Sequence, residues 1–415
     1  MYQTQKNQIR GLSAREFVAL KELCRLSKNM YNVALYNVRQ YFFSERKRLN
    51  YESNYHLSKE NENYKLLNTD IAQQTIKVVD RSFKSFIGLL QAVKTGMYNQ
   101  TVQIPKYLAK DGYFVLLLPR IEVKEDGFFK VPMSKAFQAQ FGAVRLQFPE
   151  RLKGKNIKEV RILPLYKARF FEIEYVYKEE PEPKLVSPTI ALAIDFGVDN
   201  LAACVTSTGA SFIVDGKPLK ALNQWYNKQN AYLQSKKDIQ GIKGITSRQA
   251  RLLINRNNCV RDYLNKAARY IIDYCITNQV GKLIVGYNPG IKQNINIGGR
   301  NNQNFVQIPH YSLRQKLQGL CERYGIQLVE QEESYTSRAS FLDEDNIPIY
   351  NADNPQDYKF SGFRIKRGLY RSKSGRTINA DVNGAANILR KSKHDLDLQL
   401  VCSGLLASPL RISIS

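Results

Sequence analysis

Two aspartates in this sequence stand where carboxylates could do chemistry. Asp195 directly follows the apolar run IALAI, which is typical of a buried strand. A carboxylate there is costly to bury without a partner, so we expect it at a sheet edge or beside a metal ion. Asp381 lies in INADVNGAANILRK, where it opens a helical pattern together with Asn residues. Each also has an ordinary explanation, because Asp is common in turns after strands and at the N-caps of helices.

The elements between these two aspartates are expected to bring them together. Strand patterns occur at 189–196, 201–206, 211–214, 282–286 and 326–330, and helical patterns at 217–238, 247–278, 312–324 and 382–391. Three strands followed by alternating helices and strands is the element order of a ribonuclease H-like domain. In that fold the end of the first strand lies near the start of the last helix, so Asp195 and Asp381 become neighbours.

A site built from two Asp and usually a Glu suits Mg²⁺ better than zinc, because it offers only hard oxygen ligands. Two such ions about 3.5 to 4 Å apart would polarise a scissile phosphate, prepare a water nucleophile and stabilise the leaving oxygen. The three His and six Cys have no spacing typical of a zinc site and leave few bases for a serine-type triad. We therefore expect carboxylate-based metal chemistry in a reduced, cytoplasmic protein.

The composition favours a nucleic-acid partner. The chain of 415 residues carries a formal net charge of +25, and it contains 43% apolar residues, with 25 Tyr and 19 Phe. General disorder is excluded by this apolar content, while the positive charge requires a polyanionic partner or an anionic surface. No apolar run approaches the ~20 residues of a membrane-spanning helix, so we expect nucleic acid and no membrane.

The first half of the chain is expected to hold helices followed by a β-rich domain. Ser13 and Glu16 fit a capping box before a long amphipathic helix. A second amphipathic helix spans about 69–94, with Lys77 and Arg81 on a basic face that is most simply a solvated one. Short β-type runs from 101 to 177 predict a small antiparallel sheet or barrel, and the Pro- and Glu-rich segment 178–188 predicts a linker.

Two polar segments of the second half could contact nucleic acid. The stretch 360–376 has no acidic residue, and aromatic residues lie between its basic ones, which are Arg364, Lys366, Arg367, Arg371, Lys373 and Arg376. Arg pairs with phosphate and aromatic rings stack on unpaired bases, so this stretch suits guiding a single strand; a disordered basic loop is the alternative. The loop 294–310 offers Arg300, Asn301, Asn302 and Gln303 to a nucleic-acid backbone, although it is also an ordinary polar loop.

Four stretches of the second half carry a family resemblance. They read AIDFGVDNLA, NNQNFVQIPH, EESYTSRASF and FSGFRIKRGLYRSKSGRTINADVNGAANILRK. Together they resemble the TnpB family of transposon-encoded RNA-guided nucleases, which are relatives of the type V CRISPR effectors. The similarity is densest from 189 to 390.

The resemblance implies an α+β multidomain fold. Residues 1–10 and 101–178 would form a β-barrel-like wedge domain, interrupted by a helical recognition domain at 11–100. After a linker at 179–188, residues 189–415 would form a ribonuclease H-like, RuvC-type nuclease domain. A small module would be inserted in it at about 337–378.

The second catalytic acid departs from the family pattern. The family usually has a Glu at the end of the fourth strand, whereas this chain reads LIVGYNPG with Gly286 there. Either cleavage is lost, or another carboxylate has moved in. The neighbouring strand ends in Glu330, Glu332 and Glu333, and a Gly at 286 leaves room for a longer side chain from next door.

We choose Glu333, with Glu332 second, because some family relatives have a relocated Glu three residues before a Thr-Ser pair. Glu333 has that spacing to Thr336 and Ser337. The alternative is that all three glutamates are a solvated acidic strand end. The inserted module departs as well, since the family version usually holds zinc on two CxxC pairs and 337–381 contains neither Cys nor His. No zinc is therefore expected there.

The resemblance implies an RNA-guided DNA endonuclease. A transposon-derived guide RNA would pair with target DNA next to a short flanking motif, while Asp195, Glu333 and Asp381 would bind two Mg²⁺ ions and hydrolyse double-stranded DNA. Gly286 motivates a second hypothesis, a nuclease-inactive RNA-guided DNA-binding repressor, although retention of both aspartates argues against it. A protein-only recombinase or junction resolvase is a third hypothesis. We expect a monomer.

Overall fold

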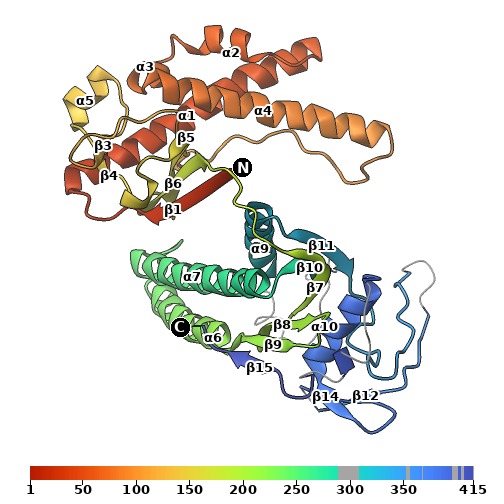
Figure 1. Ribbon diagram of the computed structural model, residues 1–415. Coiled ribbons are helices and arrows are strands. Elements are labelled where there is room, and N and C mark those ends of the chain that lie inside the picture. The colour runs from red at the N-terminus through yellow and green to blue at the C-terminus, as the bar shows by residue number, and fades with distance from the viewer. Residues whose placement is uncertain (288–307, 352–355, 367, 395–400, 403–405, 415) are drawn as a thin grey trace. The chain divides into compact units, whose positions relative to one another are not determined.

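The computed structural model describes residues 1–287, 308–351, 356–366, 368–394, 401–402 and 406–414 (Figure 1). The chain divides into two compact units, Met1–Glu179 and Glu180–Ser415. No helix in these described ranges is long and apolar enough to cross a membrane. The predicted mixed α+β architecture is confirmed, because each unit combines helices with at least one sheet.

The helices of the first unit pack around one apolar core. They are α1 (Ala14–Glu45), α2 (Tyr51–Ser58), α3 (Glu62–Leu66), α4 (Thr69–Lys94) and α5 (Lys135–Phe141), with a 3₁₀ turn at Glu150–Leu152. The predicted capping box of Ser13 and Glu16 is confirmed at the start of α1. The short helices α2 and α3 lie between α1 and α4 in the chain. Their starts are capped by Asn50 and Asn61, whose side chains accept backbone N–H groups.

The strands of the first unit form two antiparallel sheets. They are β1 (Tyr2–Gln8), β2 (Leu116–Leu118), β3 (Phe128–Lys130), β4 (Arg145–Gln147), β5 (Asn156–Leu165) and β6 (Phe170–Lys178). The larger sheet has the order β1-β6-β5-β2, and β3 pairs with β4 in the smaller one. The N-terminal strand β1 pairs with β6 along its whole length, from Tyr2 opposite Lys178 to Gln8 opposite Glu172.

The second unit is built on a six-stranded sheet of order β11-β10-β7-β8-β9-β15. Its strands are β7 (Ser187–Phe196), β8 (Asn200–Thr206), β9 (Ser211–Asp215), β10 (Val280–Tyr287), β11 (Gln327–Glu332) and β15 (Leu410–Ile412). β8 is antiparallel to both of its neighbours, β7 and β9, whereas β10 runs parallel to β7, β11 parallel to β10, and β15 parallel to β9. The strand β15 comes from the C-terminal segment, for which the sequence suggested no element.

Helices cover both faces of this sheet (Figure 1). They are α6 (Lys217–Ile239), α7 (Ser247–Thr277), α9 (His310–Tyr324) and α10 (Ala380–Lys391), and all four predicted segments are confirmed to within about three residues. Leu192 and Ile194 of β7 pack in the core that includes α7 and α9, whereas Ala191 and Ala193 pack against α10. Side chains alternate along a strand, so Asp195 follows Ala191 and Ala193 onto the α10 face.

A smaller antiparallel sheet precedes α10. It consists of β12 (Phe363–Lys366), β13 (Leu369–Arg371) and β14 (Thr377–Asn379), in that order. Tyr370 on β13 is buried in the same core as α10, and its hydroxyl donates a hydrogen bond to the backbone oxygen of Arg338. This contact ties the sheet to the segment that follows β11.

Candidate functional site

Asp195 lies one residue before the end of β7, beneath the first turns of α10. An ideal Cβ placed on Gly384 of α10 would lie only 2.4 Å from Oδ2 of Asp195. A helical Gly costs about 1 kcal/mol relative to Ala, so its presence in the middle of α10 needs a reason. The reason here is clearance, because any larger residue at 384 would collide with the Asp195 carboxylate.

Glu333 directly follows β11, and its carboxylate fills the space above Gly286 of β10. An ideal Cβ on Gly286 would lie 2.4 Å from Oε2 of Glu333 and 2.7 Å from Cδ1 of Ile388. The predicted room at Gly286 is therefore confirmed. The carboxylate of Glu333 lies over the strand end at which the family pattern has its own Glu.

The other two glutamates of this strand have cationic partners of their own. Glu332 accepts from Nζ of Lys391 and from the backbone N–H of Ser334, each at 2.6 Å. Burial alone would raise the pKa of Glu332, but these hydrogen bonds outweigh it and lower the pKa. Glu330 forms an ion pair of 3.2 Å with Arg314. Among the three, Glu333 is thus the one whose charge acts on Asp195.

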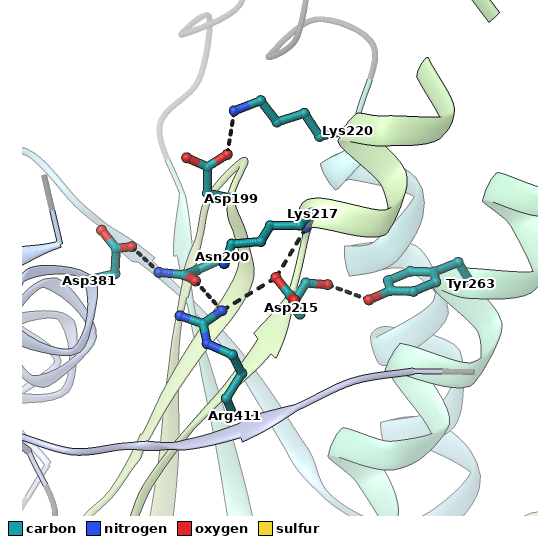
Figure 2. Close-up of polar contacts among 8 residues, drawn as sticks. All are labelled: Asp199, Asn200, Asp215, Lys217, Lys220, Tyr263, Asp381 and Arg411. Carbon is teal, nitrogen blue, oxygen red and sulfur yellow. Dashed lines mark hydrogen bonds and ion pairs between the residues drawn. The ribbon is translucent and has the colours of Figure 1, made fainter. Parts of the chain in front are cut away.

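Asp381 lies in the first turn of α10, but it is not the cap of this helix. The N-cap is Asn379, whose side chain accepts from the backbone N–H groups of Asp381 and Val382 at 3.0 and 3.2 Å. Capping therefore leaves the Asp381 carboxylate available. Its Oδ2 accepts a hydrogen bond of 2.5 Å from Asn200 (Figure 2). Arg364 lies 3.9 Å from its Oδ1.

The charges of Glu333 and Asp381 both act on the carboxylate of Asp195. Burial raises the pKa of Asp195 well above its ordinary value; the charges of Glu333 and Asp381 raise it further, and Arg364 opposes them. Burial also raises the pKa of Glu333 to about 7, with Glu332 adding to the shift and Lys391 opposing it. The structure thus brings together Asp195, Glu333 and Asp381 from β7, the end of β11 and α10. Like charges held this close favour a cation between them.

The carboxylates of Asp195, Glu333 and Asp381 are chemically suited to bind a hard divalent cation. All three side chains offer carboxylate oxygens, and a bound cation would restore the ionised forms that burial disfavours. Within the described residues, no three His, Cys, Asp or Glu side chains are already grouped tightly enough to hold a metal ion. Asp195, Glu333 and Asp381 would have to move closer together to bind one ion jointly.

Two buried asparagines on α10 hold the chain that follows Glu333. Asn383 donates to the backbone oxygen of Ala339 at 2.8 Å and accepts from the N–H of Phe341 at 3.0 Å. Asn387 donates to the oxygens of Thr336 and Ala339 at 2.9 and 2.7 Å. Because these bonds fix the segment after Glu333 to the helix that carries Asp381, they also fix the spacing of the two acids.

The described residues of the segment 337–378, where the sequence predicts an inserted module, are organised around two carboxylates. Asp343 accepts from the hydroxyls of Ser340 and Ser361 at 2.6 and 3.1 Å and from the N–H of Lys373 at 2.8 Å. Asp345 accepts from the N–H groups of Ser340 and Ser361 at 2.8 and 3.1 Å. Burial would raise the pKa of Asp343, but its hydrogen bonds, first that from Ser340, lower it. This hydrogen-bond network was not predicted, because its only signal in the sequence was the spacing of Asp and Ser residues.

The predicted nucleic-acid contacts lie in several places. In the β12–β14 region, the predicted residues Arg364, Lys366, Arg371, Lys373 and Arg376 are all exposed. In the first unit, Lys77 lies 5.2 Å from the centre of the Tyr51 ring, and Arg81 is exposed on α4. Arg300, Asn302 and Arg367 lie outside the described residues.

A pocket of about 630 Å³ opens beside the exposed basic residues. Its lining includes two arginines and four aromatic side chains, namely Arg338, Arg364, Tyr358, Phe360, Phe363 and Tyr370. The ring of Phe360 lies 5.6 Å below the guanidinium of Arg338. Aromatic faces next to guanidinium groups can stack an unpaired base and contact its phosphate.

Comparisons with known proteins agree with the resemblance seen in the sequence. Residues 174–292 match the OrfB_IS605 family, described as "Probable transposase", and residues 310–388 match the "Cas12f1-like, TNB domain" family. The predicted similarity to the TnpB family is confirmed by these two matches. No curated protein is significantly similar to the chain in sequence.

Solved structures of CRISPR effectors are also similar. The Cas12f1–sgRNA–target DNA complex matches with 15% sequence identity and a TM-score of 0.53, over 89% of this chain and 81% of that one. CasPhi-2 (Cas12j) bound to crRNA and phosphorothioate-DNA matches with 8% identity and a TM-score of 0.46, over 95% of this chain and 92% of that one. The first of these likenesses shows a shared fold.

The clearance at Gly384 gives a test with a matched control. Gly319 of α9 is also a helical Gly, but nothing lies within 4 Å of an ideal Cβ there. Gly319→Ala should therefore stabilise the protein by about 1 kcal/mol. Gly384→Ala should destabilise it by about 1–3 kcal/mol through overpacking. Unfolding midpoints measure both, and Asp195→Ala should remove most of the cost at 384. Equal stabilisation by the two Ala variants would contradict the packing of Asp195 against α10.

The hydrogen bonds that Asp343 and Asp345 accept predict that the segment 337–378 stays ordered without a bound metal. Asp343→Ala should make 337–378 more sensitive to limited proteolysis, because three donors lose their acceptor. Treatment of the wild type with EDTA should leave the cleavage pattern of this segment unchanged. Arg371→Ala, at an exposed position on β13, is the control. Protection lost on EDTA treatment would mean that a metal holds the module.

Proposed function

We propose that this protein is an RNA-guided DNA endonuclease in which Asp195, Glu333 and Asp381 bind Mg²⁺ for phosphodiester hydrolysis. The single observation that carries the proposal is the placement of the acids: the Asp195 carboxylate lies against Gly384 of the helix that carries Asp381, and the Glu333 carboxylate lies over Gly286 of the strand next to β7. A buried cluster of like charges is destabilising unless it serves a cation. The family matches and the relative solved with sgRNA and target DNA support the choice of substrate.

The topology of the second unit supports a RuvC-type, ribonuclease H-like nuclease domain. Three antiparallel strands are followed by two parallel ones on the β7 side, and α10 packs across the strands that carry the acids. We assign the first unit to guide and target binding. Its helices up to α4 would form the recognition domain, and β1 with the strands after residue 101 would form the wedge domain.

Each acid would have a distinct role in holding the metal. Asp195 is on the central strand β7, whereas Glu333 lies just beyond the edge strand β11 and Asp381 lies on α10. Bound Mg²⁺ would polarise the scissile phosphate and activate water. Arg364 lies beside Asp381 on the exposed β12 strand, so it can neutralise the backbone of an incoming strand. The aromatic pocket next to it would hold an unpaired base.

A nuclease-inactive RNA-guided repressor is the second candidate, since Gly286 stands where the family has an acid. The position of Glu333 argues against it. An inactivated site has no physical reason to keep a half-buried carboxylate packed over Gly286 and next to Asp195, because that arrangement is electrostatically costly.

The roles of the acids are tested by substitutions that remove their charge. Asp195→Ala and Glu333→Gln should each abolish cleavage of matching duplex DNA, since each removes a ligand charge, while guide RNA and target binding persist. Glu332→Gln is the matched control, because Glu332 is paired with Lys391, and it should retain cleavage. Cleavage is followed on gels and binding by filter retention without divalent ions. A fully active Glu333→Gln variant would transfer the role to another acid, and a wild type that binds target but never cuts would favour the repressor.

The dependence on RNA is tested on the purified complex. Ribonuclease treatment should abolish cleavage, because base pairing supplies the target recognition. Binding of the guide RNA should weaken steeply with salt, as expected when many Lys and Arg side chains neutralise phosphates. Sequencing of the co-purified RNA identifies the guide. Activity that survives ribonuclease would indicate a protein-only recombinase or resolvase instead.

A further inference from the structure

We infer that Asn200 positions the Asp381 carboxylate, and that Arg411 of the C-terminal strand β15 holds Asn200 in the required orientation; this rests on the proposed function. Asn200 is the first residue of β8 and is only 8% exposed. Its Nδ2 donates to Oδ2 of Asp381 at 2.5 Å, and its Oδ1 accepts from Nη1 of Arg411 at 3.0 Å. Figure 2 shows that two hydrogen bonds connect these three side chains in series.

The chemistry of the neighbours fixes which end of the Asn200 amide faces which partner. A guanidinium group can only donate, and an ionised carboxylate can only accept. Arg411 must therefore meet the amide oxygen, which leaves the NH₂ group for Asp381. Without Arg411, the amide could rotate and present its oxygen to the carboxylate, where two acceptors would repel.

Arg411 is itself fixed by the end of β9. Its Nη1 lies 3.3 Å from Oδ1 of Asp215, which also accepts from the backbone N–H of Lys217 at 3.1 Å. The Tyr263 hydroxyl donates to the backbone oxygen of Asp215 (Figure 2). The pairing of Arg411 with Ile213 in the parallel β15–β9 ladder sets the height of its side chain along the sheet. The outermost strand thus reaches across β9 to a residue that contacts a proposed metal ligand.

These contacts orient the Asp381 carboxylate by holding one of its two oxygens. Asn200 engages Oδ2, while Oδ1 faces the side on which Arg364 lies. With one oxygen held, the carboxylate cannot rotate freely, and the other remains available to a cation. Partners that orient a metal ligand in this way typically change metal affinity or activity by roughly 10–100-fold when they are removed.

The test compares variants of the full-length protein in complex with its co-purified RNA. Asn200→Ala and the isosteric Asn200→Asp remove the donor, Arg411→Ala removes the guanidinium, and Arg411→Lys keeps a cation for partial rescue. Lys220→Ala is the matched control, because Lys220 pairs with Asp199 at 2.7 Å near the same strand end and does not contact Asp381. Two readouts are measured: Mn²⁺ affinity by electron paramagnetic resonance, and the Mg²⁺ concentration that gives half-maximal cleavage.

Both Asn200 variants should weaken Mn²⁺ binding and raise the half-saturating Mg²⁺ concentration by roughly 10–100-fold. Arg411→Ala should have a smaller effect in the same direction, Arg411→Lys should recover part of it, and Lys220→Ala should match the wild type. Target binding in EDTA should be equal for all. The Arg411 side chain is 43% exposed, so the Arg411→Ala variant should stay folded. It therefore tests the inference even if Asn200→Ala unfolds.

Unchanged metal dependence in both the Asn200→Asp and Arg411→Ala variants would overturn the inference. The proposed function would then still stand, provided that Asp195→Ala is inactive. A wild-type complex that neither binds Mn²⁺ nor cleaves would overturn both. A Lys220→Ala variant as impaired as Arg411→Ala would also overturn the inference, because the effect would then come from general loosening of this strand end.

Discussion

The structure depends on bringing three negatively charged side chains to one partly buried place without losing the packing around them. Burial of a carboxylate and repulsion by its neighbours both oppose ionisation, and both act on Asp195. The surrounding residues are correspondingly small. Ala191 and Ala193 on β7 face Ala385 and Ala386 on α10, so the helix packs closely on the sheet, and Gly384 leaves the space that the carboxylate occupies. Small residues here are a requirement of the site as much as of the core.

The same reasoning explains how the proposed second acid can lie at the end of β11 instead of β10. What the metal needs is an oxygen at a point in space, and two adjacent parallel strands end close to the same point. Residue 286 of β10 pairs with residue 331 of β11, so the chain just beyond β11 lies within side-chain reach of Gly286. Removal of the side chain at 286 opens the space that the Glu333 carboxylate fills. The hydrogen bonds of Asn383 and Asn387 then hold the segment after Glu333 against α10.

Much of the fold and of the candidate site could be predicted from the sequence, and the features that could not be predicted share a physical cause. Long amphipathic helices such as α4 and α7, and the apolar strand β7, follow from local periodicity, and the space at Gly286 follows from strand adjacency. Residues whose contacts are purely tertiary gave no such signal. Asn200 looked like an ordinary residue at a strand start, and Arg411 stood in a tail with no periodic pattern. Asp343 and Asp345 looked like loop residues, because their partner Ser361 is far away in sequence.

The link between Arg411 and Asp381 also bears on how such a site is kept rigid. A strand of three residues contributes little to the core, and it would be a weak addition to a sheet edge on packing grounds alone. Its Arg, however, meets an Asp and an Asn that lie on two different strands, and one of these donates to a proposed metal ligand. The strand therefore couples the ordering of the sheet edge to the orientation of a carboxylate on α10, through an Asn that lies two strands away. A basic side chain at the periphery can thus fix an acidic one at the centre through a single amide, because an amide has one accepting end and one donating end.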